Sequence, residues 1–232
     1  MRALLSSPTY GPIDPRCASS LRYAVMVAAR NHTTWSADLS PDRMTYSSAR
    51  NMVADWVNDH PLEQDGIVWV DSDIVLSHDS LWKLLASAER TGADLYSGVY
   101  HTRREPFEPV FYTFNITTMK FTQACIYEPD TVYEVDGCGF GIVYTSTRLI
   151  QSIAKSHLFS EDGKWFPDLR AGNGPYGEDL GFCFQAMKLG FRCHVDTGIQ
   201  VGHMGDFEPV TRTTYLQALS GLGKTVEVSG KT

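Results

Sequence analysis

The feature that most constrains this sequence is a short, unbroken apolar run, Gly66-Ile67-Val68-Trp69-Val70, which leads directly into Asp71-Ser72-Asp73. A run of this length without polar alternation is typical of a strand that is covered on both faces. Such strands belong to parallel or mostly parallel sheets that carry helices on both sides. The run therefore predicts an α/β protein and places two carboxylates at the carboxyl end of a central strand.

The spacing of apolar residues elsewhere supports an alternating pattern of strands and helices. Asp14-Pro15 is typical of a helix start, and Leu21, Ala24, Val25 and Ala28 then share one helical face. The same spacing predicts further helices around Ala49–Trp56, Leu81–Ala88 and Leu180–Met187, with a weaker one near Thr213–Leu219. Further strands are expected near residues 3–5, 94–100, 109–114, 124–135, 139–144 and 192–201.

Composition narrows the class of protein. Lys plus Arg number 20 against 27 Asp plus Glu, a net charge of −7, which excludes a generally basic nucleic-acid-binding surface. No apolar run reaches the roughly 18–20 residues of a membrane span, and Ser, Pro and Gly interrupt the start before a signal peptide could form. The five cysteines are scattered without a C-x-x-C pair. We therefore expect a soluble, cytoplasmic protein with reduced thiols.

The Asp71-Ser72-Asp73 segment is the strongest candidate for chemistry. Side chains at positions i and i+2 of an extended chain point the same way, so both carboxylates are expected to face one spot. Ligands of α/β sheets bind at this edge, and a hard divalent cation would relieve the repulsion between the two charges. The alternative is a solvated strand end that precedes a helix N-cap.

Two further segments carry candidate catalytic or ligating groups. Glu178 and Asp179 open a predicted helix, where acidic residues are favoured electrostatically, but one of them could also be a partly desolvated general base. His203 lies between glycines just after a late strand. It is a candidate ligand for manganese or a related ion, and the alternative is an ordinary loop histidine.

Weaker signals come from three other places. Arg50 and Asn51 lie in a predicted helix, where the arginine either pairs with phosphate or acidic groups or faces solvent. The glycine-rich segment Gly137–Gly141 lacks Rossmann or P-loop spacing and suggests a close approach of the backbone to a sugar or a strand. Trp165 and Phe166 are either a sugar-stacking pair or a hydrophobic plug.

Taken in order, these segments resemble the GT-A fold glycosyltransferases, particularly the family-2-like enzymes that use sugar nucleotides. Pro8-Thr9-Tyr10 resembles the loop that holds the nucleotide base. The other matching segments, from the first hundred residues to the closing strand, are Ser20-Leu21, Ala49-Arg50-Asn51, Val70-Asp71-Ser72-Asp73 (the D-x-D), Asp136–Gly141, Gly177-Glu178-Asp179 with Phe182-Cys183, Val195-Asp196 and Gly202-His203.

The resemblance implies a fold and a mechanism. Residues 1–232 would form a single GT-A-type, Rossmann-like domain with a mixed, mostly parallel sheet. It would comprise a nucleotide-binding half (about 1–101), an acceptor half (about 102–210) and a C-terminal tail (211–232). Asp71, Asp73 and His203 would hold Mn²⁺ or Mg²⁺. Asp179 would be the general base and Glu178 would place the acceptor. The donor would contact Pro8, Thr9, Tyr10, Arg50, Asn51, Asp71, Ser72 and Asp73.

Some points stay open on this reading. Inversion at the anomeric carbon depends on Asp179 being the base, and a retaining outcome stays open if Asp179 is structural. The chain has no Q-x-x-R-W motif and little sequence after residue 210, which disfavours a processive synthase. The acceptor is not readable and includes glycans, proteins, small molecules and modified nucleic acid, the last because of Arg103, Arg104 and Arg212.

Three other functions compete with this prediction. A haloacid-dehalogenase-type phosphatase also uses D-x-D after a strand, with Asp71 as the nucleophile, but its motif usually follows the first strand. A sugar nucleotidyltransferase would want a basic, glycine-rich loop near the N-terminus, and residues 6–15 do not provide a repeated glycine or a basic side chain. A non-enzymatic nucleotide-sugar-binding module would not need both Asp73 and Asp179.

Overall fold

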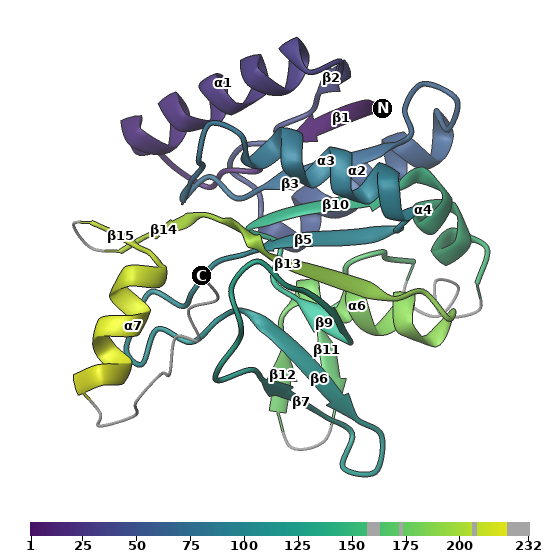
Figure 1. Ribbon diagram of the computed structural model, residues 1–232. Helices are drawn as coiled ribbons and strands as arrows, with labels where there is room; N and C mark the ends of the chain where they lie inside the picture. Colours follow the sequence, from purple (N-terminus) through teal and green to yellow (C-terminus); the bar gives the residue numbers. More distant parts are fainter. Residues whose placement is uncertain (157–162, 172–173, 206–207, 222–232) are drawn as a thin grey trace.

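The computed structural model describes residues 1–156, 163–171, 174–205 and 208–221. A seven-stranded sheet lies at its centre, in the order β2-β1-β3-β10-β5-β13-β8 (Figure 1). The strands are β1 (Arg2–Ser6), β2 (Thr34–Asp38), β3 (Gly66–Val70), β5 (Leu95–Val99), β8 (Val132–Val135), β10 (Ile142–Ser146) and β13 (Cys193–Gln200).

The sheet is mixed but mostly parallel. Strand β1 is parallel to both β2 and β3, and β13 is parallel to β5. Strand β10 is antiparallel to β3 and β5 and lies between them, and β8 is antiparallel to β13. Strands β2, β1, β3, β5 and β13 therefore run in one direction, which confirms the predicted α/β class and sheet type.

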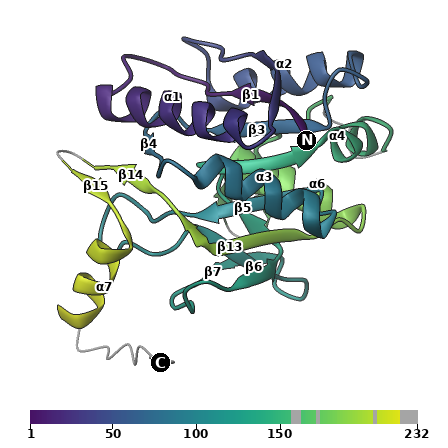
Figure 2. The ribbon, with the colours of Figure 1, turned by 45° about the horizontal axis from the view of Figure 1, so that its top comes forward.

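Helices cover both faces of this sheet (Figures 1 and 2). Helices α1 (Pro15–Arg30) and α3 (Ser80–Thr91) pack together and contribute to one apolar cluster. Helices α2 (Tyr46–Asp59), α4 (Thr147–Ala154) and α6 (Glu178–Lys188) contribute to a second cluster. The last helix, α7 (Arg212–Gly221), adds Tyr215 and Leu219 to that second cluster.

Strand β3 separates the two clusters, as its unbroken apolar sequence predicts. Ile67 and Trp69 belong to the cluster beneath α2, α4 and α6, whereas Val68 and Val70 belong to the cluster beneath α1 and α3. All four side chains are at most 1% exposed. This alternation follows from the two-residue period of a strand and fixes the position of its last residue, next to Asp71.

The inward face of helix α2 differs from the prediction. The apolar spacing favoured Ala49, Met52, Val53 and Trp56, but the buried residues are Ala49, Arg50, Val53, Ala54 and Val57. Met52 is 48% exposed, while Arg50 is only 2% exposed. The hypothesis of a solvent-facing Arg50 is therefore wrong. An arginine can occupy an inward position only when acidic partners compensate its charge.

Three small sheets lie outside the central one. The first joins β4 (Ile74–Val75), β14 (Gly202–Met204) and β15 (Pro209–Val210). The second joins β6 (Phe111–Asn115), β7 (Lys120–Gln123) and β9 (Gly137–Cys138), and the third pairs β11 (Leu169–Ala171) with β12 (Gly174–Tyr176). The sequence predicted none of these pairings.

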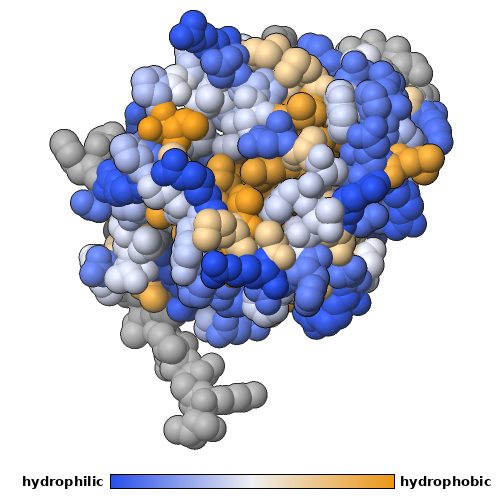
Figure 3. Space-filling view, turned by 90° about the horizontal axis from the view of Figure 1, so that it is seen from above, coloured by the Kyte–Doolittle hydropathy of each residue, from blue (hydrophilic) through white to orange (hydrophobic). Residues whose placement is uncertain are grey.

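The outer surface carries a mixture of polar and apolar residues. In the face seen from above, apolar side chains gather near the middle and hydrophilic ones surround them (Figure 3). Across the described parts of the chain, no helix combines the length and apolarity that crossing a membrane requires.

Candidate active site

The candidate site lies where the parallel strands of the central sheet end. Strands β1, β3, β5 and β13 run in the same direction, so their carboxyl ends meet at one edge. The residues that follow them include Ser7, Asp71 to Asp73, Tyr100 to Arg103, and His203. Ligands of open α/β sheets bind at this edge.

The two carboxylates of the D-x-D segment have different contacts. The chain turns directly after β3, where the Asp71 N–H donates to the Gly141 carbonyl (3.1 Å) and the Ile74 N–H donates to the Asp71 carbonyl (3.1 Å). Asp71 and Asp73 therefore do not lie on one extended strand, and their carboxylates have different partners. The expectation that both face one spot assumed an extended backbone, and the chain turns at this point instead.

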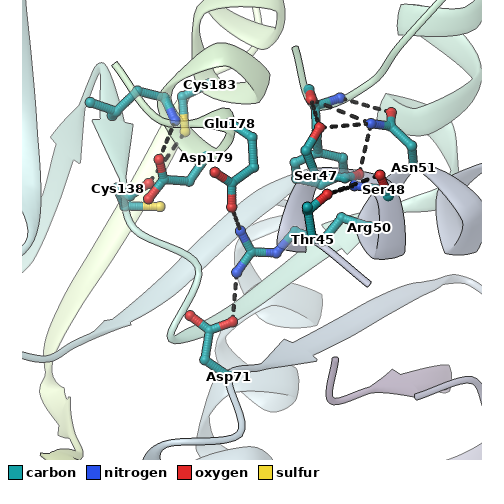
Figure 4. A network of polar contacts seen from close by, with 12 residues as sticks. Thr45, Ser47, Ser48, Arg50, Asn51, Asp71, Cys138, Glu178, Asp179 and Cys183 are labelled. Atoms are coloured by element: carbon teal, nitrogen blue, oxygen red, sulfur yellow. Dashed lines mark hydrogen bonds and ion pairs between the residues drawn. The ribbon is translucent and has the colours of Figure 1, made fainter. Parts of the chain in front are cut away.

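Arg50 organises the first group of acidic residues. Its Nη2 lies 2.5 Å from Oδ1 of Asp71, and its Nη1 lies 2.5 Å from Oε1 of Glu178 (Figure 4). The guanidinium group also lies over the ring of Phe140, 5.1 Å from its centroid. The Arg50 side chain is 3% exposed, so the ion pairs form in a largely desolvated place. One buried cation thus ties the end of β3 to the first turn of α6.

Asp179 stands next to this ion-pair network, one residue into α6. Its Oδ1 accepts a hydrogen bond from the Leu180 N–H at 2.8 Å. Burial raises the pKa of Asp179 to about 6, Glu178 adds to the rise, and the charge of Arg50 opposes it. A carboxylate with this pKa is a stronger base than an ordinary aspartate while remaining ionised at pH 7.

Asp73 and His203 form a second group. The short ladder between β4 and β14 pairs His203 with Ile74, and the Met204 N–H donates to the Asp73 carbonyl at 2.8 Å. This backbone pairing brings Nε2 of His203 to 3.6 Å from Oδ2 of Asp73. The ladder explains how Asp73 and His203, which are distant in the sequence, reach the same spot.

The hydrogen bonds of His203 assign its tautomer. Its Nδ1 lies 2.8 Å from the His101 carbonyl, which can only accept, so Nδ1 carries the proton. Nε2 is then an acceptor and receives a hydrogen bond from Nε of Arg103 at 2.8 Å. The same guanidinium group forms an ion pair with Asp73. A carbonyl hydrogen bond at one ring nitrogen is the usual way in which a protein orients a ligating histidine.

The Asp73–His203 pair fits a divalent cation in its donor atoms. Oδ1 of Asp73 is buried without a hydrogen-bond partner among the described residues, and Nε2 of His203 presents a lone pair. The described residues do not, however, bring three or more His, Cys, Asp or Glu side chains together as a metal cluster. Asp71 contacts Arg50 instead, so its predicted ligand role remains a prediction. Mg²⁺ and Mn²⁺ sites commonly take their other ligands from phosphates and water.

A cavity of about 180 Å³ opens beside the D-x-D segment. Cys17, Ala18 and Leu21 of α1 line one side, and Ser7, Asp71 and Ser72 line the other. Burial raises the pKa of Cys17 to about 11, so its thiol is neutral at pH 7. The cavity is smaller than a typical site for a whole drug-sized ligand, and its lining is mostly apolar.

The predicted Pro8-Thr9-Tyr10 loop borders this region. The Thr9 N–H donates to the Pro41 carbonyl at 3.0 Å, and the Thr9 hydroxyl donates to the Gly11 carbonyl at 2.7 Å. Tyr10 is 71% exposed. Thr9 therefore holds the loop in place, whereas the Tyr10 ring is accessible to a ligand.

Asn51 has a different setting from the other predicted donor residues. Its Oδ1 accepts hydrogen bonds from the N–H groups of Trp165 (2.8 Å) and Phe166 (3.1 Å). Its Nδ2 donates to the Ser47 carbonyl at 2.8 Å. The side chain thus anchors the 165–166 segment to α2, while the binding role assigned to it from sequence stays a prediction. Trp165 and Phe166 are buried, as the plug interpretation requires.

Sequence reasoning did not assign Tyr100 or Arg103 a place in the site. The ring of Tyr100 meets that of His203 edge to face at 5.3 Å. It packs so closely on the glycine-rich segment that a Cβ at Gly139 would lie 2.0 Å from its hydroxyl. The only available signal was position, because both residues follow a strand that ends at the same sheet edge.

The comparisons with known proteins concern the fold. No protein-family model matches the chain, and no curated protein matches it in sequence. The solved structure of A197 from STIV is 18% identical, with a TM-score of 0.57 over 89% of this chain and 87% of that chain. The structure of GalNAc-T7 with UDP, GalNAc and Mn²⁺ is 10% identical, with a TM-score of 0.57 over 94% of this chain and 47% of that chain.

This chain has a GT-A-like fold. Its fold is similar to that of GalNAc-T7, although it spans only about half of that protein's length. At these low identities the likeness concerns architecture, and the chemistry has to be argued from the site.

Proposed function

We propose that the protein is a metal-dependent glycosyltransferase, which moves a sugar from a nucleotide-sugar donor to an acceptor hydroxyl. The observation that carries the proposal is that two kinds of functional side chain lie at one sheet edge. A carboxylate with a raised pKa, Asp179, supplies a base. An oxygen–nitrogen pair, Asp73 and His203, suits a divalent cation. The GT-A-like fold supports this reading, and GalNAc-T7 was crystallised with UDP and Mn²⁺.

The donor's nucleotide would enter from the side of α1. The 180 Å³ cavity lies between α1 and the end of β3, next to Asp71 and Ser72, and would accept the base or ribose. The exposed Tyr10 ring is available to cover the base by stacking. The diphosphate would then lie near Asp73 and His203.

Asp73 and His203 would hold Mn²⁺ or Mg²⁺ through Oδ1 and Nε2, respectively. When bound, the cation supplies a Lewis acid that stabilises the charge of the departing diphosphate. The protein orients these ligands beforehand, because the β4–β14 ladder fixes their backbones and His101 fixes the histidine tautomer.

Asp179 would act as the general base. Its carboxylate takes the proton of the acceptor hydroxyl as the acceptor oxygen attacks the anomeric carbon. The bond to the donor phosphate oxygen breaks, and the diphosphate leaves with the electron pair. Direct attack opposite the leaving group inverts the anomeric carbon. Glu178, held by Arg50, would place the acceptor, and its fixed position limits the orientations that the acceptor can take.

The rival phosphatase reading requires Asp71 to attack phosphorus. The Asp71 carboxylate is instead paired with the buried Arg50, and the residue follows β3 and not the first strand. An arginine partner lowers the nucleophilicity of a carboxylate by stabilising its charge. The geometry of Asp71 therefore favours a supporting role.

The decisive experiment is calorimetric titration of UDP, GDP and CMP, and of their sugar conjugates, with and without Mn²⁺. Asp73→Asn is compared with Glu63→Gln, which removes an exposed acidic charge outside the site. We expect Mn²⁺-dependent binding of one nucleotide, lost in Asp73→Asn and retained in Glu63→Gln, followed by slow release of nucleoside diphosphate from the matching sugar conjugate. Failure of every nucleotide to bind under any metal condition would overturn the proposal.

A further inference from the structure

Arg103 occupies an unusual position for an arginine on the surface of this molecule. Its Nε donates to Nε2 of His203 at 2.8 Å, and its Nη2 forms an ion pair with Oδ2 of Asp73. The two partners are the ones proposed above as the protein ligands of a divalent cation. A guanidinium group and a metal ion cannot both use the His203 lone pair, because it accepts a single donor.

The arginine lies on the solvent side of this pair. The Arg103 side chain is 52% exposed, compared with 23% for Asp73 and 14% for His203. Its segment follows β5, and the backbone around it includes hydrogen bonds from Thr102 N–H to the Glu108 carbonyl and from Phe107 N–H to the Arg104 carbonyl. The side chain can therefore leave for solvent by rotating about its own bonds, without opening the core.

The contacts that Arg103 makes are of a kind that a divalent cation can replace. Exposed ion pairs contribute little net stability, since solvent screens them and long side chains lose conformational freedom when they form. Imidazole nitrogen and carboxylate oxygen are both ligands that divalent cations accept, so a cation can take the place of the guanidinium group at these atoms. The described contacts of Arg103 thus orient the two ligands but are weak enough for a cation to replace them.

We infer that Arg103 is an internal counter-ion of the metal site. Its guanidinium group occupies the Asp73–His203 pair when the divalent cation is absent, and the cation binds by displacing it. The inference rests on the proposed metal site and deepens it by naming the residue that sets its affinity. The arginine keeps both ligands oriented and neutralises Asp73, and it makes the apparent affinity for a cation weaker than the two ligands alone would give.

The test is titration of Mn²⁺ alone, without nucleotide, followed by the electron paramagnetic resonance signal of free Mn²⁺ and by calorimetry. Arg103→Gln removes the competing cation. Arg104→Gln is the matched control, since it removes the same charge one residue away, from a side chain that forms no ion pair within the described part of the chain. Thermal unfolding checks that both variants fold.

We expect Arg103→Gln to bind Mn²⁺ roughly fivefold more tightly than the wild type, which corresponds to about 1 kcal/mol. Arg104→Gln should change the affinity much less. Arg103→Lys keeps the charge but cannot donate to both partners in the same fork geometry, so its affinity should lie between those of the wild type and Arg103→Gln. In Asp73→Asn/Arg103→Gln the gain should disappear.

Two results would overturn the inference, and they differ in their reach. Equal gains in Arg103→Gln and Arg104→Gln, or weaker Mn²⁺ binding in Arg103→Gln, would show that Arg103 does not compete for the ligands, while leaving the proposed function intact. Failure of the wild type and of every variant to bind Mn²⁺ without nucleotide would remove the counter-ion role, and the nucleotide titration described above would then decide the proposed function separately.

Discussion

Nη1 of Arg50 lies 2.5 Å from Oε1 of Glu178, although 128 residues separate the two in the sequence. The other terminal nitrogen of the same guanidinium group contacts Asp71, so one side chain joins two halves of the candidate site. The predictions below begin with this contact.

Replacing Arg50 by Met should leave Asp71 and Glu178 without their cation. Both carboxylates are mostly buried, and breaking such pairs on one side costs about 3–5 kcal/mol. Arg50→Lys keeps the charge but reaches one partner at a time, so it should cost less. Urea unfolding measures both losses. Equal stability of Arg50→Met and the wild type would show that the ion pairs contribute nothing to the fold.

Replacing His203 by Gln should weaken Mn²⁺-dependent nucleotide binding by at least about tenfold, because one of the two proposed protein ligands is lost. Calorimetry with UDP and saturating Mn²⁺ measures the effect. His78→Gln is a suitable control, as this histidine lies beyond the D-x-D segment and contacts the ring of Tyr23. Unchanged binding in His203→Gln would argue that Asp73 recruits the cation without the histidine.

Filling the cavity beside α1 should block the nucleotide without affecting the cation. Ala18→Trp places an indole ring among the lining residues, whereas Ser19→Trp places the same ring on the exposed side of the helix. We expect UDP binding to fail in Ala18→Trp alone and the affinity for Mn²⁺ by itself to persist in both variants. UDP binding by Ala18→Trp would show that the base lies elsewhere.

Asp179 should control the pH dependence of transfer. A base with a pKa of about 6 loses its proton as the pH rises through that value, so kcat should increase over this range and level off near pH 7. The profile is measured at saturating Mn²⁺ and donor, so that occupancy of the site does not vary with pH. Asp179→Asn should reduce kcat by about 10²–10⁴-fold. A flat profile from roughly pH 5 to pH 7 would assign the base to another group.

The same residue should make activity and stability change in opposite directions. Its pKa is about 6 in the fold against an ordinary value of 3.8, so the folded state binds the proton more tightly than the unfolded chain. The contribution of Asp179 to the free energy of unfolding is then largest below about pH 4, and it is lost as the pH rises through about 6. Asp179→Asn, which cannot ionise, should therefore be more stable than the wild type at pH 8 and lose this advantage near pH 4. Urea midpoints at the two pH values measure the difference, and an equal gain at both would argue for a packing effect.

The sequence predicted the elements whose local pattern agrees with their environment. The run from Gly66 to Val70 is apolar on both faces because helices cover both faces, and Asp14 caps α1 through a hydrogen bond from the Arg16 N–H. Strand β2 escaped prediction. Its sequence, Thr-Trp-Ser-Ala-Asp, is short and mostly polar, as suits a strand at the edge of the sheet.

The sequence supplied the candidate residues of the site but not the contacts between them. Asp71, Asp73, Glu178, Asp179 and His203 carry recognisable chemistry, but nothing local shows that Arg50 turns inward or that Arg103 reaches His203. Both contacts depend on tertiary structure. The helix face of α2 is set by its buried partners, and the Asp73–His203 pair by a ladder between segments that are distant in the sequence.

That ladder has a consequence for how the C-terminal part of the chain is secured. Asp73 directly precedes β4, and His203 lies in β14, which forms backbone hydrogen bonds with this segment, so an ion bound by both would link two parts of the chain that are distant in the sequence. Every increment of affinity for the ion is then also an increment of resistance to detachment of β14, β15 and α7. The free energy of cation binding would thus also stabilise the attachment of these elements to the rest of the fold.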